Sequence, residues 1–176
     1  MQHFIKALGM STVLLVSSAY AETVSFPKTA ALTYSGNGGV TATMGFNRST
    51  SNYNINTTFK IPLYSMQFRS SGGMNGNTMV PNSYSDTRRG KLYAQAKFNH
   101  GSKTITYGKA GENKTAPMRG VPMDLFSLAW QLALNNGKVS GVSQFTNGKK
   151  VYNEATNIRA AGTQNVKFKG KPLSVN

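Results

Sequence analysis

Apolar and polar residues alternate with a period of two along much of this chain, which is the pattern of β-strands that bury one face. The alternation predicts four strands and a short fifth over residues 104–107. Glycine and asparagine turn signals at 36–39 and 99–102 separate the runs, and Asn147-Gly148 predicts a two-residue hairpin between Phe145 and Val151. Short strands joined by tight turns predict an antiparallel meander. The apolar side of the four strands carries Val40, Ala42, Met44 and Phe46; Tyr53, Ile55, Thr57 and Phe59; Tyr64, Met66 and Phe68; and Leu92, Ala94, Ala96 and Phe98.

One segment breaks the strand rhythm. Residues 122–136 (PMDLFSLAWQLALNN) predict a helix, since Pro122 and Asp124 suit a helix start and Asn136-Gly137 suits its end. Apolar residues go nearly all the way round this helix, so we expect it to be buried on most sides and packed against the sheet. A helix lying on a membrane is the alternative, but it would need a charged face, and the polar side here holds Asp124, Ser127 and Gln131.

The fold class that follows is all-β: an antiparallel meander curved into an open barrel or half-barrel, lipocalin-like or lipoprotein-carrier-like, with the helix on its concave side. We expect one β-rich domain over residues 22–176, because no repeat or internal boundary is visible. The chain has no cysteine, so this domain is held by its core rather than by disulfides. The concave lining we expect is Met44, Phe46, Tyr53, Phe59, Met66, Phe68 and Trp130.

The first 21 residues predict a cleavable signal peptide, with Lys6 before an apolar run over residues 7–16 and Ala19-Tyr20-Ala21 as the cleavage site. The apolar run is shorter than the ~20 residues that span a bilayer, although an uncleaved N-terminal anchor is the alternative. The exported chain would begin at Glu22, and no cysteine follows for lipid attachment. We therefore expect a protein of the bacterial periplasm.

The chain is strongly basic, with 20 Lys and Arg against five acids and a formal net charge of +15. Such a charge attracts polyanions. In an envelope these are anionic lipid headgroups, glycolipid phosphates and wall polymers, and nucleic acid is not an expected partner. The alternative is that the charge keeps a β-rich protein soluble and protects its edge strands.

Residues suited to catalysis are sparse. His100 is the one histidine after the predicted cleavage site, and it lies in a predicted turn, where a solvated role is the plainer interpretation. Asp124 and Glu154 could form a carboxylate pair of the kind that hydrolyses glycosides, although Asp124 also suits a helix start. No cofactor or metal site is predicted, because the five acids are dispersed and cysteine is absent.

Residues 69–73 (RSSGG) admit two interpretations. One is a flexible loop between strands. The other is a set of backbone amides that binds an anion together with Arg69 and Arg88. Taken with the aromatic residues of the concave side, the candidate ligand-binding residues are Arg69, Arg88, Arg89, Tyr84, Phe68 and Trp130.

Several short segments, taken in order, resemble the bacterial exported family called domain of unknown function 3108. They are Leu32-Thr33-Tyr34, Phe68-Arg69-Ser70-Ser71-Gly72, residues 80–84 (VPNSY) followed by Arg88-Arg89-Gly90-Lys91, Lys97-Phe98-Asn99 and residues 122–132 (PMDLFSLAWQL). The resemblance covers roughly residues 29–162. It implies an exported, β-rich protein with one central helix, and it implies no catalytic residue, cofactor or substrate. This chain departs from the family at Asn99, where an acid is common, and in a shorter C-terminal part, which leads us to expect an open sheet edge.

Three functional hypotheses follow. The first is a non-catalytic envelope binding module for an amphipathic or anionic ligand, a lipid or glycolipid, with contact to the membrane surface. The second is a structural or assembly partner that another envelope protein completes by adding a strand. The third is a hydrolase of an envelope polymer.

Overall fold

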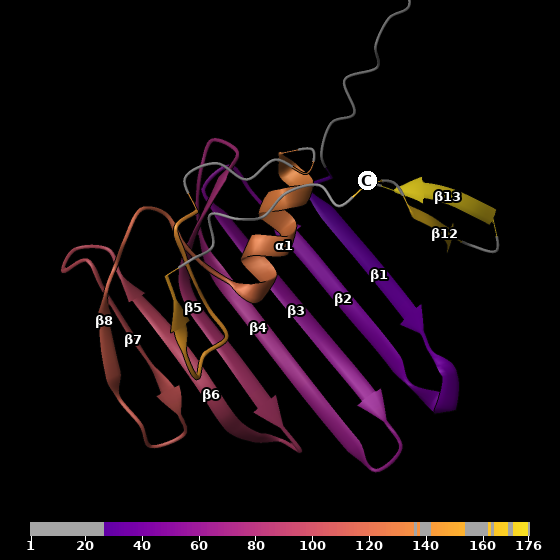
Figure 1. Cartoon of the computed structure of the whole chain (residues 1–176), viewed down its shortest axis with the longest axis horizontal. Coiled ribbons are helices and arrows are strands. Elements are labelled where there is room, and N and C mark those ends of the chain that lie inside the picture. Colours follow the sequence, from indigo (N-terminus) through magenta and orange to yellow (C-terminus); the bar gives the residue numbers. More distant parts are fainter. Residues whose placement is uncertain are drawn as a thin grey trace, which may run out of the picture.

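The computed structural model describes residues 27–135, 137, 142–153, 162, 164–168 and 171–175. Its main element is an antiparallel sheet in which each of eight consecutive strands pairs with the next (Figure 1). The predicted signal peptide and Glu154 lie outside the described residues. The strands are β1 (Thr29–Ser35), β2 (Thr41–Arg48), β3 (Asn52–Ile61), β4 (Tyr64–Asn75), β5 (Thr78–Arg88), β6 (Lys91–Asn99), β7 (Thr104–Lys109) and β8 (Lys114–Pro117).

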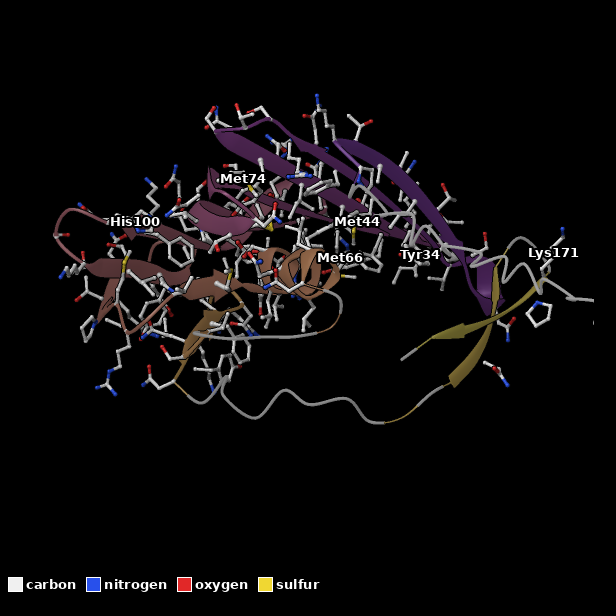
Figure 2. The ribbon with its side chains drawn as sticks, turned by 90° about the horizontal axis from the view of Figure 1, so that it is seen from above. Tyr34, Met44, Met66, Met74, His100 and Lys171 are labelled. Carbon is white, nitrogen blue, oxygen red and sulfur yellow. The ribbon has the colours of Figure 1, made fainter. Side chains whose placement is uncertain are left out.

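The prediction of an all-β meander that forms an open half-barrel is confirmed. The sheet bends around the side that carries the helix, and β1 and β8 stay apart as its two edges (Figure 2). The interpretation of residues 69–73 as a loop is wrong. They lie inside β4, which continues for 12 residues to Asn75 and pairs along its length with β5. The serines and glycines misled the prediction because they suit turns as well as a strand that a neighbouring backbone approaches closely.

Gly72 shows why a glycine is needed inside this long strand. The register between β4 and β5 shifts between Ser71 and Gly72, and Gly72 faces Pro81 across the ladder. A Cβ atom at Gly72 would collide with the carbonyl oxygen of Val80 and crowd the backbone of Pro81. The glycine therefore allows β5 to bulge toward β4.

The two faces of the sheet differ sharply. Residues on the outer face of β2 and β3 are exposed threonines and asparagines such as Thr43, Asn54 and Asn56. The inner face is apolar, and its buried positions form two clusters that the helix bridges. The first cluster contains Phe46, Tyr53, Ile55, Met79, Met123, Trp130 and Val142. The second contains Tyr84, Ala96, Phe98 and Ile105.

The helix is shorter than predicted. α1 spans Leu125–Leu134, and the residues before it form a short strand, β9 (Pro122–Asp124). Pro122 is therefore in a strand rather than at the helix start. One stripe of the helix, Leu125, Ala129 and Ala133, is exposed, and its other residues are buried or half-buried, as expected of a helix that is covered on most sides. Its buried residues are Ser127, Trp130 and Gln131, so the side that the sequence marked as polar faces the sheet.

A small second sheet consists of β9, β10 (Gln144–Thr146) and β11 (Val151–Tyr152). The predicted hairpin between Phe145 and Val151 is present, but its connection has four residues instead of two, since Thr146 pairs directly with Val151. The side chain of Asn147 accepts hydrogen bonds from the backbone of Lys149 and Lys150, which stabilises the longer turn. A separate hairpin, β12 (Gln164–Phe168) and β13 (Lys171–Val175), lies beyond the β1 edge in Figure 1.

Candidate functional site

A buried polar network fixes α1 to the middle of the inner face. Asp124 caps the helix, because one carboxylate oxygen accepts hydrogen bonds from the backbone N–H groups of Phe126 and Ser127, both at 3.0 Å. Its other carboxylate oxygen accepts a 2.6 Å hydrogen bond from the hydroxyl of Ser70 on β4. The Ser70 hydroxyl in turn lies 3.2 Å from the hydroxyl of Tyr53 on β3. The network thus joins the helix start to the centres of two strands.

Burial governs the ionisation of this network. Burial raises the pKa of Asp124, against the opposing effect of its hydrogen bonds from Ser70, Ser127 and Phe126. Burial and the neighbouring Asp124 likewise raise the pKa of Tyr53, so its hydroxyl stays neutral. Both Asp124 oxygens are occupied by protein donors, and the residue has no exposed surface. The arrangement is that of a helix cap and tether.

Gln131 makes the second attachment of α1, two turns further along. Its side-chain oxygen accepts a 2.7 Å hydrogen bond from the backbone of Met79, and its amide group donates to the carbonyl of Asn77 at 2.9 Å. Asn77 lies in the turn between β4 and β5. The helix therefore runs from the middle of the sheet toward the end that holds this turn, as Figure 1 shows.

The opposite half of the inner face is not covered by the helix. Five large side chains of β1 to β4 lie there on the same side of the sheet as α1, and we call them the open patch. Tyr34 is 54% exposed, and the other four are half-buried. Figure 2 shows Tyr34, Met44 and Met66 on this side. The open patch consists of Tyr34, Met44, Phe59, Tyr64 and Met66.

Two of the three predicted arginines lie beside the open patch. Arg88 pairs across the ladder with Met66, and the guanidinium of Arg89 lies 5.0 Å from the ring centre of Tyr64. Arg88 forms a salt bridge of 2.9 Å with the buried Asp86 and stacks 3.7 Å above the ring of Tyr93. The hydrogen bonds that Arg88 donates to Asp86 raise the pKa of Arg88. Both arginines are thus positioned by aromatic rings at the border of the patch.

Arg69 is not part of this group. It alternates with Phe68 and Ser70 on β4, so it is exposed on the outer face, opposite the helix. The structure therefore separates Arg69 from Arg88 and Arg89, although the sequence suggested one anion site containing all three.

The three aromatic candidates belong to the core around α1. Trp130 stacks on Phe46, with ring centres 4.0 Å apart. Phe68 contacts both Phe59 of the open patch, at 5.7 Å, and Phe126 of the helix, at 5.3 Å. Tyr84 is buried against Phe126, and burial raises the pKa of its hydroxyl. Phe68 is therefore the candidate that connects the open patch with the core.

His100 lies in the predicted turn between β6 and β7. One of its ring nitrogens lies 2.7 Å from the carbonyl oxygen of Pro81, so the side chain braces the bulged strand β5. Within the described part of the chain, no group of three His, Cys, Asp or Glu residues could hold a metal ion. Likewise, none of the helices in that part is long and apolar enough to cross a membrane.

Sequence reasoning missed three features of this region. Tyr34 was not assigned to the inner face, although its alternation with Leu32 on β1 carried that signal. The pairing of Arg88 with Asp86 was also missed. Two residues two positions apart share a face only in a strand, and this segment was not recognised as one. Strand β5 was not predicted, since Pro81 and two serines weaken its period-two pattern.

Comparison with known proteins adds no relative. No family model matches the chain, no curated protein matches it, and no solved structure matches it. The resemblance to domain of unknown function 3108 stays a prediction.

Proposed function

We propose that this protein is a non-catalytic module of the bacterial periplasm that binds an amphipathic anionic ligand, such as a lipid or glycolipid, on the open patch. The observation that carries the proposal is the incomplete cover of the concave face. A folded monomer ordinarily buries such a continuous apolar surface, and exposed apolar patches of this kind mark binding sites. Here the open patch stays partly exposed while the adjoining half is closed by α1.

The border of the open patch supplies the anion-binding chemistry. A carboxylate or phosphate headgroup would contact Arg89, which has no carboxylate partner among the described residues, and Arg88, whose side chain is 34% exposed beside Asp86. The acyl chain would lie over Met44, Phe59 and Met66. Methionine side chains adapt to irregular apolar ligands, which suits a site for a flexible chain.

The proposal is tested by titrating the exported protein with oleate and with lysophosphatidylglycerol by calorimetry, below the concentration at which each lipid forms micelles. Met66→Gln should weaken binding at least tenfold, because it places an amide group in the apolar site. Met74→Gln is the matched control, since Met74 is also half-buried on the inner face of β4 but near its other end. Oleate and lysophosphatidylglycerol separate a carboxylate from a phosphate headgroup. Equal losses in the two variants, or no binding by the wild type, would contradict the proposal.

A second candidate function rests on the edge of the sheet. β1 has seven residues and pairs with β2 alone among the described strands, so its outer backbone groups are available to a strand of another envelope protein. Native mass spectrometry of protein purified from the envelope distinguishes the two candidates. A bound lipid mass supports the first, and a protein partner in fixed stoichiometry supports the second.

A further inference from the structure

Large exposed apolar side chains gather at one end of the sheet. In an antiparallel meander, the β1–β2, β3–β4, β5–β6 and β7–β8 turns lie at the same end. Four of the six exposed large apolar residues that the described chain contains are in or near these turns: Tyr34, Ile61, Leu63 and Leu92. Turns at the opposite end, such as residues 49–51 and 76–77, hold serine, threonine, asparagine and glycine. Solubility alone does not explain this asymmetry, because a soluble protein favours polar residues at both ends.

Leu63 is the most unusual of these residues. It is 97% exposed and has a φ of 63° in the two-residue turn between Ile61 and Tyr64. A proline followed by a residue with positive φ is typical of a turn that takes glycine or asparagine at that second position. A leucine there costs backbone energy and exposes a large apolar side chain to water. Both effects are unfavourable for the folded chain, and Leu63 gains no packing contact from the described residues in return. The leucine therefore points to an interaction with another molecule.

Basic side chains surround this apolar tip. Lys60, Ile61, Leu63, Tyr64, Ser65 and Arg89 line a shallow hollow of about 350 Å³. The backbone N–H of Arg89 donates to the carbonyl of Ser65 at 2.9 Å, which holds the β5–β6 turn against this hollow. Lys91, the first residue of β6, follows this turn and is exposed. The two salt bridges of the described chain involve Arg88 and Lys114, so Lys60, Arg89 and Lys91 keep their charges available.

We propose that this end of the sheet docks on an anionic lipid bilayer, with the tip residues Ile61, Leu63 and Leu92 entering the interface and Lys60, Arg89 and Lys91 contacting lipid phosphates. Each element contributes what such docking needs: apolar side chains that leave water and cations that approach the headgroups. This membrane docking goes beyond the proposed function, since the tip residues can bind a bilayer whether or not a single lipid molecule binds to the open patch. It would place the open patch next to the membrane surface.

The test measures co-sedimentation with vesicles of phosphatidylethanolamine and phosphatidylglycerol, using protein expressed with its own leader and purified after export. Leu63→Asn should weaken binding roughly tenfold or more, because a buried leucine contributes about ten- to a hundredfold to partitioning. Asparagine tolerates positive φ, so the variant should fold at least as well as the wild type. Leu125→Gln is the matched control, since Leu125 is 41% exposed on α1, away from the tip.

Charge is tested separately. Replacing Lys60, Arg89 and Lys91 together by glutamine should weaken binding by about fivefold per residue at low salt. The same change at Lys28, Lys97 and Lys103 removes equal charge from exposed positions elsewhere and should have a much smaller effect. Since the chain has no cysteine, Leu63→Cys and Lys103→Cys can each carry a polarity-sensitive fluorophore. The label at residue 63 should enter an apolar environment on vesicle binding, and the label at residue 103 should stay in water.

Three results would overturn the dock: no binding to these vesicles at low salt, equal losses from Leu63→Asn and Leu125→Gln, or equal losses from the two triple variants. The last result would make the attraction a diffuse effect of net charge. Single-lipid binding that survives Leu63→Asn would leave the open patch intact as a site, so failure of the dock and failure of the proposed function are distinguishable.

Discussion

The tether between Ser70 and Asp124 provides the sharpest test of how the helix is held. Ser70→Ala removes a 2.6 Å hydrogen bond to a buried carboxyl group and leaves one oxygen of Asp124 without its donor. It also removes the neighbour of the Tyr53 hydroxyl at 3.2 Å. An unsatisfied buried acceptor costs about 1–3 kcal/mol, so we expect Ser70→Ala to lower the free energy of unfolding by about 2 kcal/mol. For a domain of this size, the melting temperature should fall by about 4–8 °C.

The adjacent residue supplies the control. Ser71 is also a serine of β4, but its hydroxyl lies 2.8 Å from that of Ser83 on the solvent side of the sheet. Ser71→Ala should cost about 0.5 kcal/mol or less, because water replaces the lost partner. Urea unfolding of both variants at pH 7, followed by Trp130 fluorescence and far-ultraviolet circular dichroism, measures the difference. If the two variants agree to within about 0.5 kcal/mol, the buried tether does not hold the helix.

Three further predictions concern the same core. Burial raises the pKa of Asp124, so the folded protein binds the carboxyl proton more tightly than the unfolded chain does. The wild type should therefore gain stability relative to Asp124→Asn as the pH falls from 7 to about 4. Urea titrations across this pH range that show no such gain would refute this prediction. Trp130→Ala should cost about 3–5 kcal/mol, and wild-type Trp130 emission should be blue-shifted until urea unfolds the chain; water-like emission from the folded protein would exclude the packed helix. Gly72→Ala should cost about 3 kcal/mol or more in thermal melts, whereas Gly45→Ala, whose Cβ would meet no atom closer than 3.9 Å, should stay within about 1 kcal/mol.

The period-two alternation of apolar and polar residues predicted most of the strands of the large sheet. It located β2, β3, β6 and β7 because most of their apolar positions repeat on one face. The expectation that Leu92 lies on the buried side of β6 is wrong, because a bulge separates it from Ala94 and leaves it 42% exposed. The alternation failed for β5, where a bulge at Asn82 shifts the repeat by one residue and Pro81 suggests a break. Bulges depend on how two backbones meet, and a single strand's sequence does not show that.

The helix and the site show a second limit. Asp124 was recognised as a helix-start acid, but the strand before it was not, because β9 forms only by pairing with β10 some 20 residues later. The polar side of α1 faces the sheet because Ser70 and the backbone around Asn77 supply partners there. The separation of Arg69 from Arg88 and Arg89 likewise depends on which face each residue occupies. Such pairings between distant segments are set by tertiary contacts rather than by local composition.

The central claim is that an amphipathic ligand lies over the open patch, and the methionines of this chain can test it directly. Met44 and Met66 belong to the patch, Met74 is similarly accessible near the other end of β4, and Met79 and Met123 are fully buried. Protein with ¹³C-labelled methionine methyl groups is titrated with a nitroxide-labelled fatty acid and observed by NMR. We predict strong broadening of the Met44 and Met66 signals, with Met74, Met79 and Met123 little changed. Equal broadening at Met66 and Met74, or none at Met44 and Met66, would contradict the account.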